Sequence, residues 1–198
     1  MQKAVLVAYG EYNNEYHFCK DDYIIAIDGG YSYLKKQRIK PNLFIGDNDS
    51  NKLVIDKDIK KIILPKEKDD TDSLYAIKAC LKLGFDRFEL YGFLGKEFSH
   101  SLANIQVLLY LKKKRVNAKI IEKNKTYLIL HNERIKLKKE GKLTLLSLSN
   151  KSKVTLKNLK YPLKKHILTN DFPLGIDNEF IDKESEITIH SGYVLLIY

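Results

Sequence analysis

Two carboxylates one residue apart, Asp47 and Asp49, follow a short apolar run that ends in glycine (LFIG, residues 43–46). The run predicts a buried strand, so both carboxylates lie on the loop at its C-terminal end. Two more acidic segments have a similar setting: DGG at residues 28–30 follows an apolar run, and KDDTD at residues 68–72 precedes a helical pattern. In an open α/β sheet the C-terminal ends of the strands meet at one crevice, where ligands bind. The chain is therefore predicted to gather acidic side chains at one edge of a sheet.

Several oxygen ligands in one crevice suit a hard cation, and Mg²⁺ with a nucleotide phosphate is a common occupant of such a site. The alternative is that Asp, Gly, Asn and Ser simply make turns. Any one of these loops favours the turn alternative. Three in sequence, each beside a strand or helix pattern, favour a ligand site.

The first 118 residues alternate strand and helix patterns. Strands are predicted at residues 3–9, 23–27, 43–45, 62–64 and 87–93, and helices at 31–38, 72–83 and from about residue 100. Thr71 is the predicted N-cap of the second helix and Gly84 its C-terminal stop, and Ser99 is the predicted cap of the third. This alternation favours a three-layer, Rossmann-like α/β domain at residues 1–118, with a largely parallel sheet covered by helices.

Residues 119–198 show a different pattern. Short strands are predicted at residues 126–130, 134–137, 143–148, 153–156, 186–190 and 193–198, and several alternate polar and apolar side chains. No segment has a convincing helical period. These features predict an all-β domain, an antiparallel sandwich or barrel.

The formal net charge of +10 raises the question of a nucleic-acid partner, because basic surfaces attract phosphates. The positive charge is almost entirely lysine. Arginine, which reads bases and phosphates bidentately, is confined to Arg38, Arg87, Arg115 and Arg134. We therefore expect a polyanionic substrate such as ATP to use this charge, and no nucleic-acid partner.

No stretch approaches the roughly 18 apolar residues of a membrane helix, and the N-terminus lacks a signal-peptide pattern. Cys19 and Cys80 lack metal-ligand spacing and have apolar neighbours in the sequence. We expect two buried, reduced thiols and a cytoplasmic protein without a membrane partner.

Six short motifs occur in a fixed order along the chain. They are DGG (28–30), GDNDS (46–50), KDDTD (68–72), HSLAN (100–104), LKYPL (159–163) and GIDNEF (175–180). Each is weak by itself, but the ordered set is specific, extends over nearly the whole chain and resembles the thiamine pyrophosphokinase family. The resemblance implies an N-terminal α/β domain that binds ATP and magnesium, a C-terminal β-sandwich at residues 119–198 that binds thiamine, and a homodimer with sites between subunits.

The resemblance also implies a reaction: transfer of the terminal diphosphate of ATP to the hydroxyl of thiamine, which gives thiamine diphosphate and AMP. Catalysis of phosphoryl transfer is mostly positioning and neutralisation of charge. Matching motif positions gives Asp47, Asp49 and Asp72 as the catalytic residues that hold Mg²⁺, and one carboxylate could also accept the proton of the hydroxyl. Positions matched to nucleotide and metal binding are Asp28, Gly29, Gly30, Ser50, Lys68, Asp69, Thr71, His100 and Asn104, and those matched to the acceptor are Ser99, Asp177 and Asn178.

Most assignments have a structural alternative. Asp72 could only stabilise the first turn of its helix, and Lys68 could be a surface lysine. His100 and Asn104 share a helix face at a spacing of four residues, yet His100 could be a first-turn surface residue. Tyr161 is expected to shape a turn rather than touch a ligand.

The chain departs from the family pattern on the acceptor side. The family has Gly-Arg-x-Asp-His where this chain has KEFSH at residues 96–100, so Glu97 replaces Arg and Ser99 replaces Asp. A cation is thereby exchanged for an anion, and Lys96 is the neighbouring residue that could compensate. Asp177 likewise stands where the family has Ser. Three functions remain open: thiamine pyrophosphokinase, diphosphate transfer to another hydroxymethyl heterocycle such as a pterin, or a nucleotide- or thiamine-binding protein without catalysis.

Overall fold

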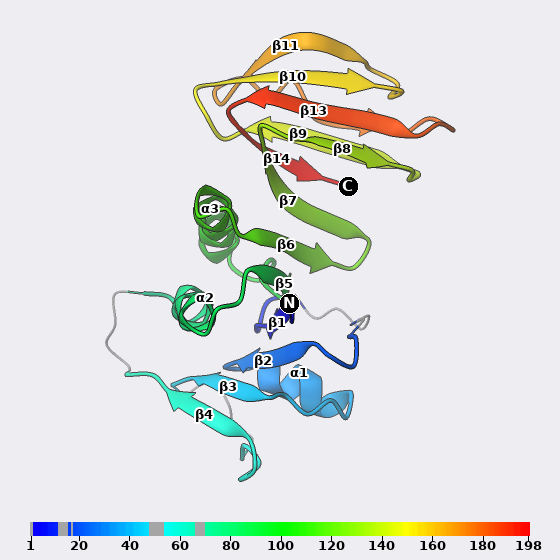
Figure 1. Ribbon diagram of the computed structural model, residues 1–198. Coiled ribbons are helices and arrows are strands. Elements are labelled where there is room, and N and C mark those ends of the chain that lie inside the picture. Colours follow the sequence, from blue (N-terminus) through cyan, green and yellow to red (C-terminus); the bar gives the residue numbers. More distant parts are fainter. Residues whose placement is uncertain (1, 12–15, 17, 48–53, 66–69) are drawn as a thin grey trace. The chain divides into compact units, whose positions relative to one another are not determined.

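Two units make up the chain, residues 1–123 and residues 124–198. The computed structural model describes residues 2–11, 16, 18–47, 54–65 and 70–198 (Figure 1). The predictions for Asp49, Ser50, Lys68 and Asp69 lie outside these described residues.

The sheet of the first unit is parallel throughout, with the strand order β6-β5-β1-β2-β3-β4 (Figure 1). Its strands are β1 (Ala4–Val7), β2 (Tyr23–Ile27), β3 (Leu43–Gly46), β4 (Lys60–Ile63), β5 (Arg87–Tyr91) and β6 (Asn117–Glu122). Every residue of β1 and β3 is buried, because central parallel strands are covered on both faces. The predicted α/β domain with a largely parallel sheet is confirmed.

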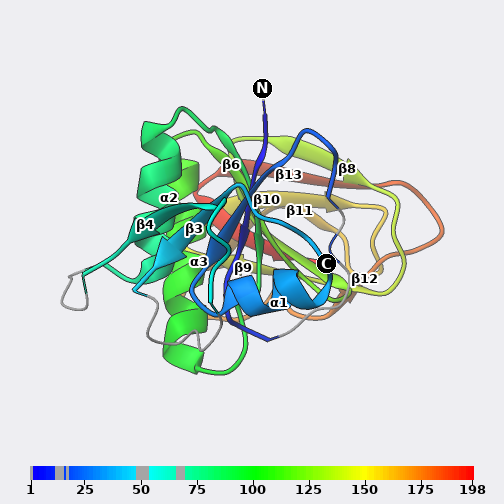
Figure 2. The ribbon, with the colours of Figure 1, turned by 90° about the horizontal axis from the view of Figure 1, so that it is seen from below.

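Helices cover both faces of this sheet (Figure 2). They are α1 (Gly30–Lys36), α2 (Asp72–Lys82) and α3 (Phe98–Lys113). Helix α1 packs Tyr31 and Leu34 into a cluster with Val5, Val7 and Phe44 on one face. Helices α2 and α3 lie on the opposite face, where α2 buries Ala76, Ile77 and Cys80. The three-layer arrangement follows from strands that are apolar on both sides.

The order of the strands creates a switch point beside β1. The chain runs outward from β1 through β2 and β3 to β4, and α2 then carries it back to β5 on the other side of β1. Connections therefore leave β1 and β5 toward opposite edges of the sheet. In open α/β sheets such a point leaves a crevice at the C-terminal ends of the strands.

The ends of the helices test the capping predictions. The Thr71 hydroxyl accepts a hydrogen bond from the Leu74 N–H at 3.2 Å, and Gly84 follows α2 in the left-handed conformation at φ 88°, so both predictions for α2 are confirmed. The prediction that Ser99 caps α3 is wrong. Helix α3 begins at Phe98, and Glu97 is its N-cap without a side-chain hydrogen bond. Glu97 has the extended backbone of an N-cap residue, and the helix begins at the next residue. Ser99 therefore lies inside the first turn and not at the cap position.

The second unit consists of two antiparallel sheets. Its strands are β7 (Lys125–His131), β8 (Arg134–Leu137), β9 (Lys142–Ser147), β10 (Lys151–Lys157), β11 (Leu163–Thr169), β12 (Asn178–Glu179), β13 (Ser185–Ser191) and β14 (Tyr193–Ile197). One sheet has the order β12-β9-β14-β7 and the other β11-β10-β13-β8, and each pair within them is antiparallel. This architecture confirms the predicted antiparallel sandwich, whereas the sequence patterns did not predict β6, β11 or β12.

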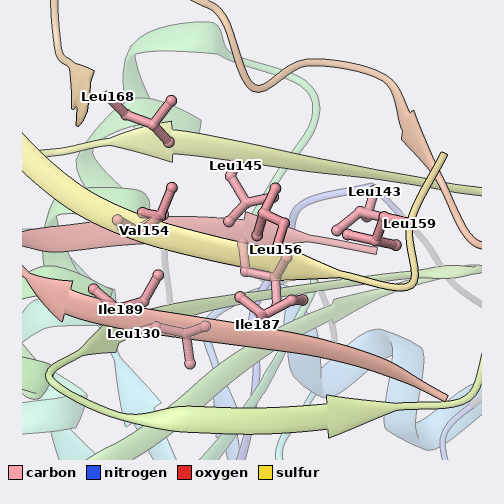
Figure 3. Packing of buried hydrophobic residues seen from close by; sticks show 11 residues of the cluster. Leu130, Leu143, Leu145, Val154, Leu156, Leu159, Leu168, Ile187 and Ile189 are labelled. Atoms are coloured by element: carbon pink, nitrogen blue, oxygen red, sulfur yellow. The ribbon is translucent and has the colours of Figure 1, made fainter. Parts of the chain in front are cut away.

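Alternating burial produces the core of the second unit. Strands β9, β10 and β13 bury every second residue, which is the pattern of a sheet with one face in the core. Figure 3 shows these side chains gathered among the strands. The buried cluster consists of Leu130, Leu143, Leu145, Val154, Leu156, Leu159, Leu168, Ile187, Ile189, Val194 and Leu196.

Neither cysteine forms a disulfide, and only one of them is buried. Cys80 lies inside α2, where burial raises the pKa of its thiol to about 12. Cys19 is exposed, so the prediction of two buried thiols is wrong for this residue. Cys19 begins a surface turn in which its N–H donates to the Asp22 carboxylate at 2.8 Å. No helix among the described residues is both long and apolar enough to cross a membrane.

Candidate functional site

A cavity of about 490 Å³ lies at the C-terminal ends of β1, β2, β3 and β5, at the switch point of the first unit. Its walls are the segments that follow these strands and the first turns of α2 and α3. The described lining residues are 8–10, 27–28, 47, 70–73, 92–93, 95–97, His100 and Asn104. The crevice predicted from the acidic loops is therefore present, and it is built from those loops.

Three of the predicted carboxylates line this cavity together: Asp28, Asp47 and Asp72. Asp28 has left-handed backbone at φ 45°, and its Oδ1 accepts the N–H of Asp47 at 3.2 Å. Burial, a hydrogen bond to the Asp72 side chain and the charges of both neighbours raise the pKa of Asp28 to about 7. Near neutral pH, a part of the Asp28 carboxyl groups therefore stays protonated.

Gly46 gives the Asp28 carboxylate its space. A Cβ atom at residue 46 would lie 1.9 Å from Oδ1 of Asp28, well inside contact distance. The glycine that ends β3 is therefore needed by the acidic side chain at the end of β2. The ends of β2 and β3 together therefore determine the position of the Asp28 carboxylate.

The donor set suits a hard cation in its chemistry. Carboxylate oxygens are the ligands that Mg²⁺ prefers. Burial first, and then the neighbouring carboxylates Asp72 and Asp47, raise the pKa of Asp28. Among the described residues, no three or more His, Cys, Asp or Glu side chains are close enough to form a metal site. The predicted set of Asp47, Asp49 and Asp72 stays a prediction, because Asp49 lies outside the described part of the chain.

The start of α2 forms a second wall. Asp70 lines the cavity, but its carboxylate is paired with the Lys78 ammonium, with Oδ2 and Nζ 2.7 Å apart. Thr71 uses its hydroxyl to cap the helix. The positive end of the helix macrodipole and Asp72 therefore face the cavity side by side.

The start of α3 contributes His100 and Asn104, which both line the cavity as their spacing predicts. His100 is exposed. Asn104 is buried, and its Nδ2 donates to the Phe93 carbonyl at 2.6 Å, so it holds the adjacent loop. Ser99 is exposed and is not among the described residues that line the cavity.

Gly29 and Gly30 are buried behind the wall of the cavity rather than in it. A Cβ atom at Gly29 would lie 2.5 Å from the ring of Tyr9, and one at Gly30 would lie 2.0 Å from the Val7 carbonyl oxygen. Close packing between the ends of β1 and β2 thus explains both glycines. Their contact with a nucleotide stays a prediction.

Asp177 and Asn178 lie in the second unit. Asn178 is buried and spans the backbone of Tyr161: its Oδ1 accepts the Tyr161 N–H at 3.0 Å and its Nδ2 donates to the Tyr161 carbonyl at 2.8 Å. Asp177 is exposed and pairs with Lys142 at 2.9 Å. The structure explains Asn178 by its support of the turn at Tyr161, and the acceptor roles of both residues stay predictions.

Lys96, which the sequence offered as the cation that could compensate for Glu97, lines the cavity together with Tyr9, a residue outside the motifs. The Lys96 ammonium lies 3.0 Å from the centre of the Tyr9 ring, which stacks on Tyr33 at 5.1 Å. Burial lowers the pKa of Lys96. Lys96 is the only lysine or arginine among the described residues that line the cavity.

Glu122, at the end of β6, was also missed. Its Oε1 accepts the N–H of Phe93 at 3.0 Å and the N–H of Leu94 at 3.2 Å. Burial is the largest of the effects that raise the pKa of this carboxyl to about 7. No sequence signal marked Glu122, because its strand was not predicted and its partners are backbone groups distant in sequence.

Comparisons with known proteins agree with this arrangement. Residues 15–120 match the family model described as thiamin pyrophosphokinase, catalytic domain, and residues 131–194 match the one described as thiamin pyrophosphokinase, vitamin B1 binding domain. A comparison with curated proteins found no match.

Solved structures of low sequence identity share the fold. Thiamine pyrophosphokinase from Bacillus subtilis is 21% identical, with a TM-score of 0.84 over 100% of this chain and 98% of that one. The enzyme from Geobacillus thermodenitrificans is 20% identical, with a TM-score of 0.85 over 100% and 96%. Thiamin pyrophosphokinase from Candida albicans is 15% identical, with a TM-score of 0.78 over 99% and 88%.

Asp28→Asn tests the crowding of the carboxylates. Asn keeps the shape of the side chain and tolerates left-handed backbone, and it removes a charge that burial and two acidic neighbours disfavour. We expect a melting temperature at pH 8 with EDTA equal to that of the wild type, or higher by up to about 4 °C, the shift that about 1 kcal/mol gives at this size. Asp58→Asn, at an exposed pair with Lys40, is the control. A clear loss of stability in Asp28→Asn alone would mean that the charge is favourably placed.

Glu122→Gln tests the raised pKa. The ordinary pKa of this carboxyl is 4.5 and its folded value is about 7. Between these values the unfolded chain releases the proton and the folded chain keeps it, so the contribution of Glu122 to the free energy of unfolding falls as the pH rises from about 4.5 to about 7. In urea titrations, the stability of Glu122→Gln relative to wild type should therefore increase from pH 5 to pH 8. A difference that does not vary with pH contradicts the shift.

Proposed function

The chain belongs to the thiamin pyrophosphokinase family, and we propose that the acidic cavity of its first unit is where the family's reaction takes place. In that reaction the terminal diphosphate of ATP is transferred to the hydroxyl of thiamine, with release of AMP. The observation that carries the proposal is the convergence of Asp28, Asp47 and Asp72 on one cavity at the switch point of a parallel sheet.

The arrangement of charge around the cavity supports this assignment. Phosphoryl transfer needs positioning and neutralisation of the polyphosphate. The cavity is lined by carboxylates, by Lys96 and by the N-terminal end of α2. Helix N-termini bind phosphate through free N–H groups and the positive end of the macrodipole. A metal-bound triphosphate therefore finds ligands for its cation and partners for its oxygens in the same space.

We assign Mg²⁺ to the carboxylates Asp47 and Asp72, with Asp28 as a supporting group and Asp49, two residues after Asp47 in the sequence, as a further ligand. When bound, the cation would neutralise phosphate oxygens and raise the electrophilicity of the transferred group. Asp28 keeps Asp72 and the Asp47 backbone in place through its hydrogen bonds. A carboxylate of this set is also the candidate acceptor for the proton of the thiamine hydroxyl.

Lys96 takes the part of the phosphate-binding cation that the family has one position later. Glu97 stands at that later position, lines the cavity and begins α3. Left-handed backbone at Lys96, φ 50°, directs the chain so that its ammonium lies over Tyr9. The Tyr9 ring takes the place of part of the water around the Lys96 ammonium. This cation–π contact is weak, so exchanging it for a phosphate oxygen costs little free energy. The change at Glu97 is thus compatible with ATP binding.

The second unit is proposed to bind thiamine and to form the interface of a homodimer. Its match to the vitamin B1 binding domain supports the first role. Several large apolar side chains between residues 161 and 181 remain exposed, which supports the second, since such surfaces mark interaction sites. They are Tyr161, Ile167, Phe172, Leu174, Ile176 and Ile181.

Asp47→Asn and Asp72→Asn test the catalytic site. AMP release from Mg·ATP is measured with and without thiamine, with thiamine diphosphate quantified in parallel. Wild type should form the two products in equal amounts, and each variant should lose at least about 100-fold in turnover because a charged metal ligand is gone. Thermal unfolding verifies that the variants fold, and Asp58→Asn, at an exposed surface pair, should keep full activity. Near-normal rates in both variants would place the metal elsewhere, and thiamine-independent or absent AMP release would reject thiamine as the acceptor.

Lys96→Met tests the phosphate contact. We expect the KM for ATP to rise by about tenfold or more, since a hydrogen bond to a charged group is lost, and Lys96→Arg should recover much of the affinity. Lys82→Met, an exposed lysine at the end of α2, serves as the control. An unchanged KM in Lys96→Met would show that the ammonium stays on Tyr9 throughout the reaction.

A further inference from the structure

The loop between β5 and α3, residues 92–97, is one wall of the cavity and has an irregular backbone. Gly92, Gly95 and Lys96 are all left-handed, with φ of 66°, 85° and 50°. A segment of this kind cannot satisfy its N–H and C=O groups by regular helix or sheet bonding. Its conformation must be fixed by partners from other elements.

The backbone N–H groups of Gly10 and Glu11 donate to the Gly92 and Leu94 carbonyls at 2.7 and 2.8 Å, and three side chains provide further partners. Asn104 binds the Phe93 carbonyl and Ser101 accepts the Gly95 N–H at 3.1 Å, both from the helix that the loop enters. Glu122 comes from a different element, the end of β6. One of its two carboxylate oxygens, Oε1, accepts the N–H groups of both Phe93 and Leu94, at 3.0 and 3.2 Å.

Successive N–H groups that converge on one point form an anion-binding concavity, a feature that often holds phosphate. Here the protein's own carboxylate fills that concavity. The N–H groups of Phe93 and Leu94 are therefore engaged by Glu122 and are not offered to a ligand. The loop contributes one cation to the lining of the cavity, the ammonium of Lys96.

Stability alone does not explain an acid at this position. Burial and the nearby Glu11 both disfavour the charged form of Glu122, and a glutamine would accept the same N–H groups without a charge. An ionised acceptor makes stronger and shorter hydrogen bonds than a neutral one. The charge thus strengthens the hold on the loop at a cost to folding, as is common where a site needs precise geometry.

We propose that Glu122 is a positioning residue, which holds the 92–97 loop by the N–H groups of Phe93 and Leu94 in the conformation that presents Lys96 to the cavity. The proposal rests on the proposed function of Lys96 as the phosphate-binding cation. Glu122 itself does not touch the substrate. It acts through Lys96.

The test is a double-mutant cycle on the affinity for Mg·ATP, measured by calorimetry on the full chain. Glu122→Ala should weaken binding by about tenfold, the order of effect of a misplaced hydrogen bond to a charged group. In the Lys96→Met background the same change should have an effect of less than about twofold, because the group it positions is already absent. Glu122→Gln, which keeps the acceptor atom, should bind better than Glu122→Ala. Equal losses in both backgrounds would overturn the proposal.

Glu89→Gln separates positioning from general destabilisation. Glu89 is a largely buried carboxylate of β5 that pairs with Lys3 and Lys119 at 2.7 and 3.0 Å and does not line the cavity. This variant should lower the melting temperature and leave the affinity for Mg·ATP unchanged. If Glu89→Gln weakens binding as much as Glu122→Ala does, the effect of Glu122 is loss of stability and the proposal fails.

Hydrogen exchange gives a readout that does not depend on ATP. Peptides that contain residues 92–97 should exchange at least about tenfold faster in Glu122→Ala than in wild type, while peptides from β1 and β2 stay unchanged. Glu122→Gln keeps the protein testable if Glu122→Ala does not fold. Unchanged exchange in the loop overturns the positioning role even if Mg·ATP binds as proposed. Failure of wild type to bind Mg·ATP, with faster loop exchange in the variant, would reject the proposed role of Lys96 and leave Glu122 as the residue that holds the loop.

Discussion

The pairing of β1 with both β2 and β5 is the constraint on which the site depends. Parallel pairing on both sides aligns the C-terminal ends of these strands, and the chain must leave β1 and β5 in opposite directions. Side chains cannot fill the gap that results. Every wall of the cavity is a segment that follows β1, β2, β3 or β5, or a helix that starts beside them.

This geometry brings like charges together. Asp28 lies next to Asp72 and accepts the N–H of Asp47. Burial and these acidic neighbours disfavour its charged form and raise its pKa. Glu122, which binds the 92–97 loop, is likewise a carboxyl group whose charged form is disfavoured by burial and by a nearby acid, Glu11. Asp28 and Glu122 thus have a pKa of about 7 mainly because they are buried. Such burial is common where a fold preorganises a binding site.

Several residues of the family motifs are explained by packing. Gly29 and Gly30 allow β1 and β2 to approach closely, and Asn178 holds the backbone of Tyr161. A sequence motif thus includes residues that only support a site as well as residues that line it. The structure separates the two kinds: Asp28, Asp47, Asp72 and His100 line the cavity, whereas the glycines and Asn178 stabilise its surroundings or the second unit.

The sequence by itself determined the fold class and the acidic half of the site. Apolar runs that end in glycine or aspartate predict the buried strands of the first unit. Alternation of polar and apolar residues in 119–198 predicts the antiparallel sheets of the second. Both patterns are readable because burial acts on neighbouring residues of one strand. Only the tertiary structure showed how Lys96 and Glu122 are placed at the site. The Lys96–Tyr9 contact joins two loops far apart in sequence, and Glu122 meets its partners through a strand, β6, that no local pattern marked. Contacts with backbone groups leave no periodic signal in the sequence, since any residue type provides the same N–H.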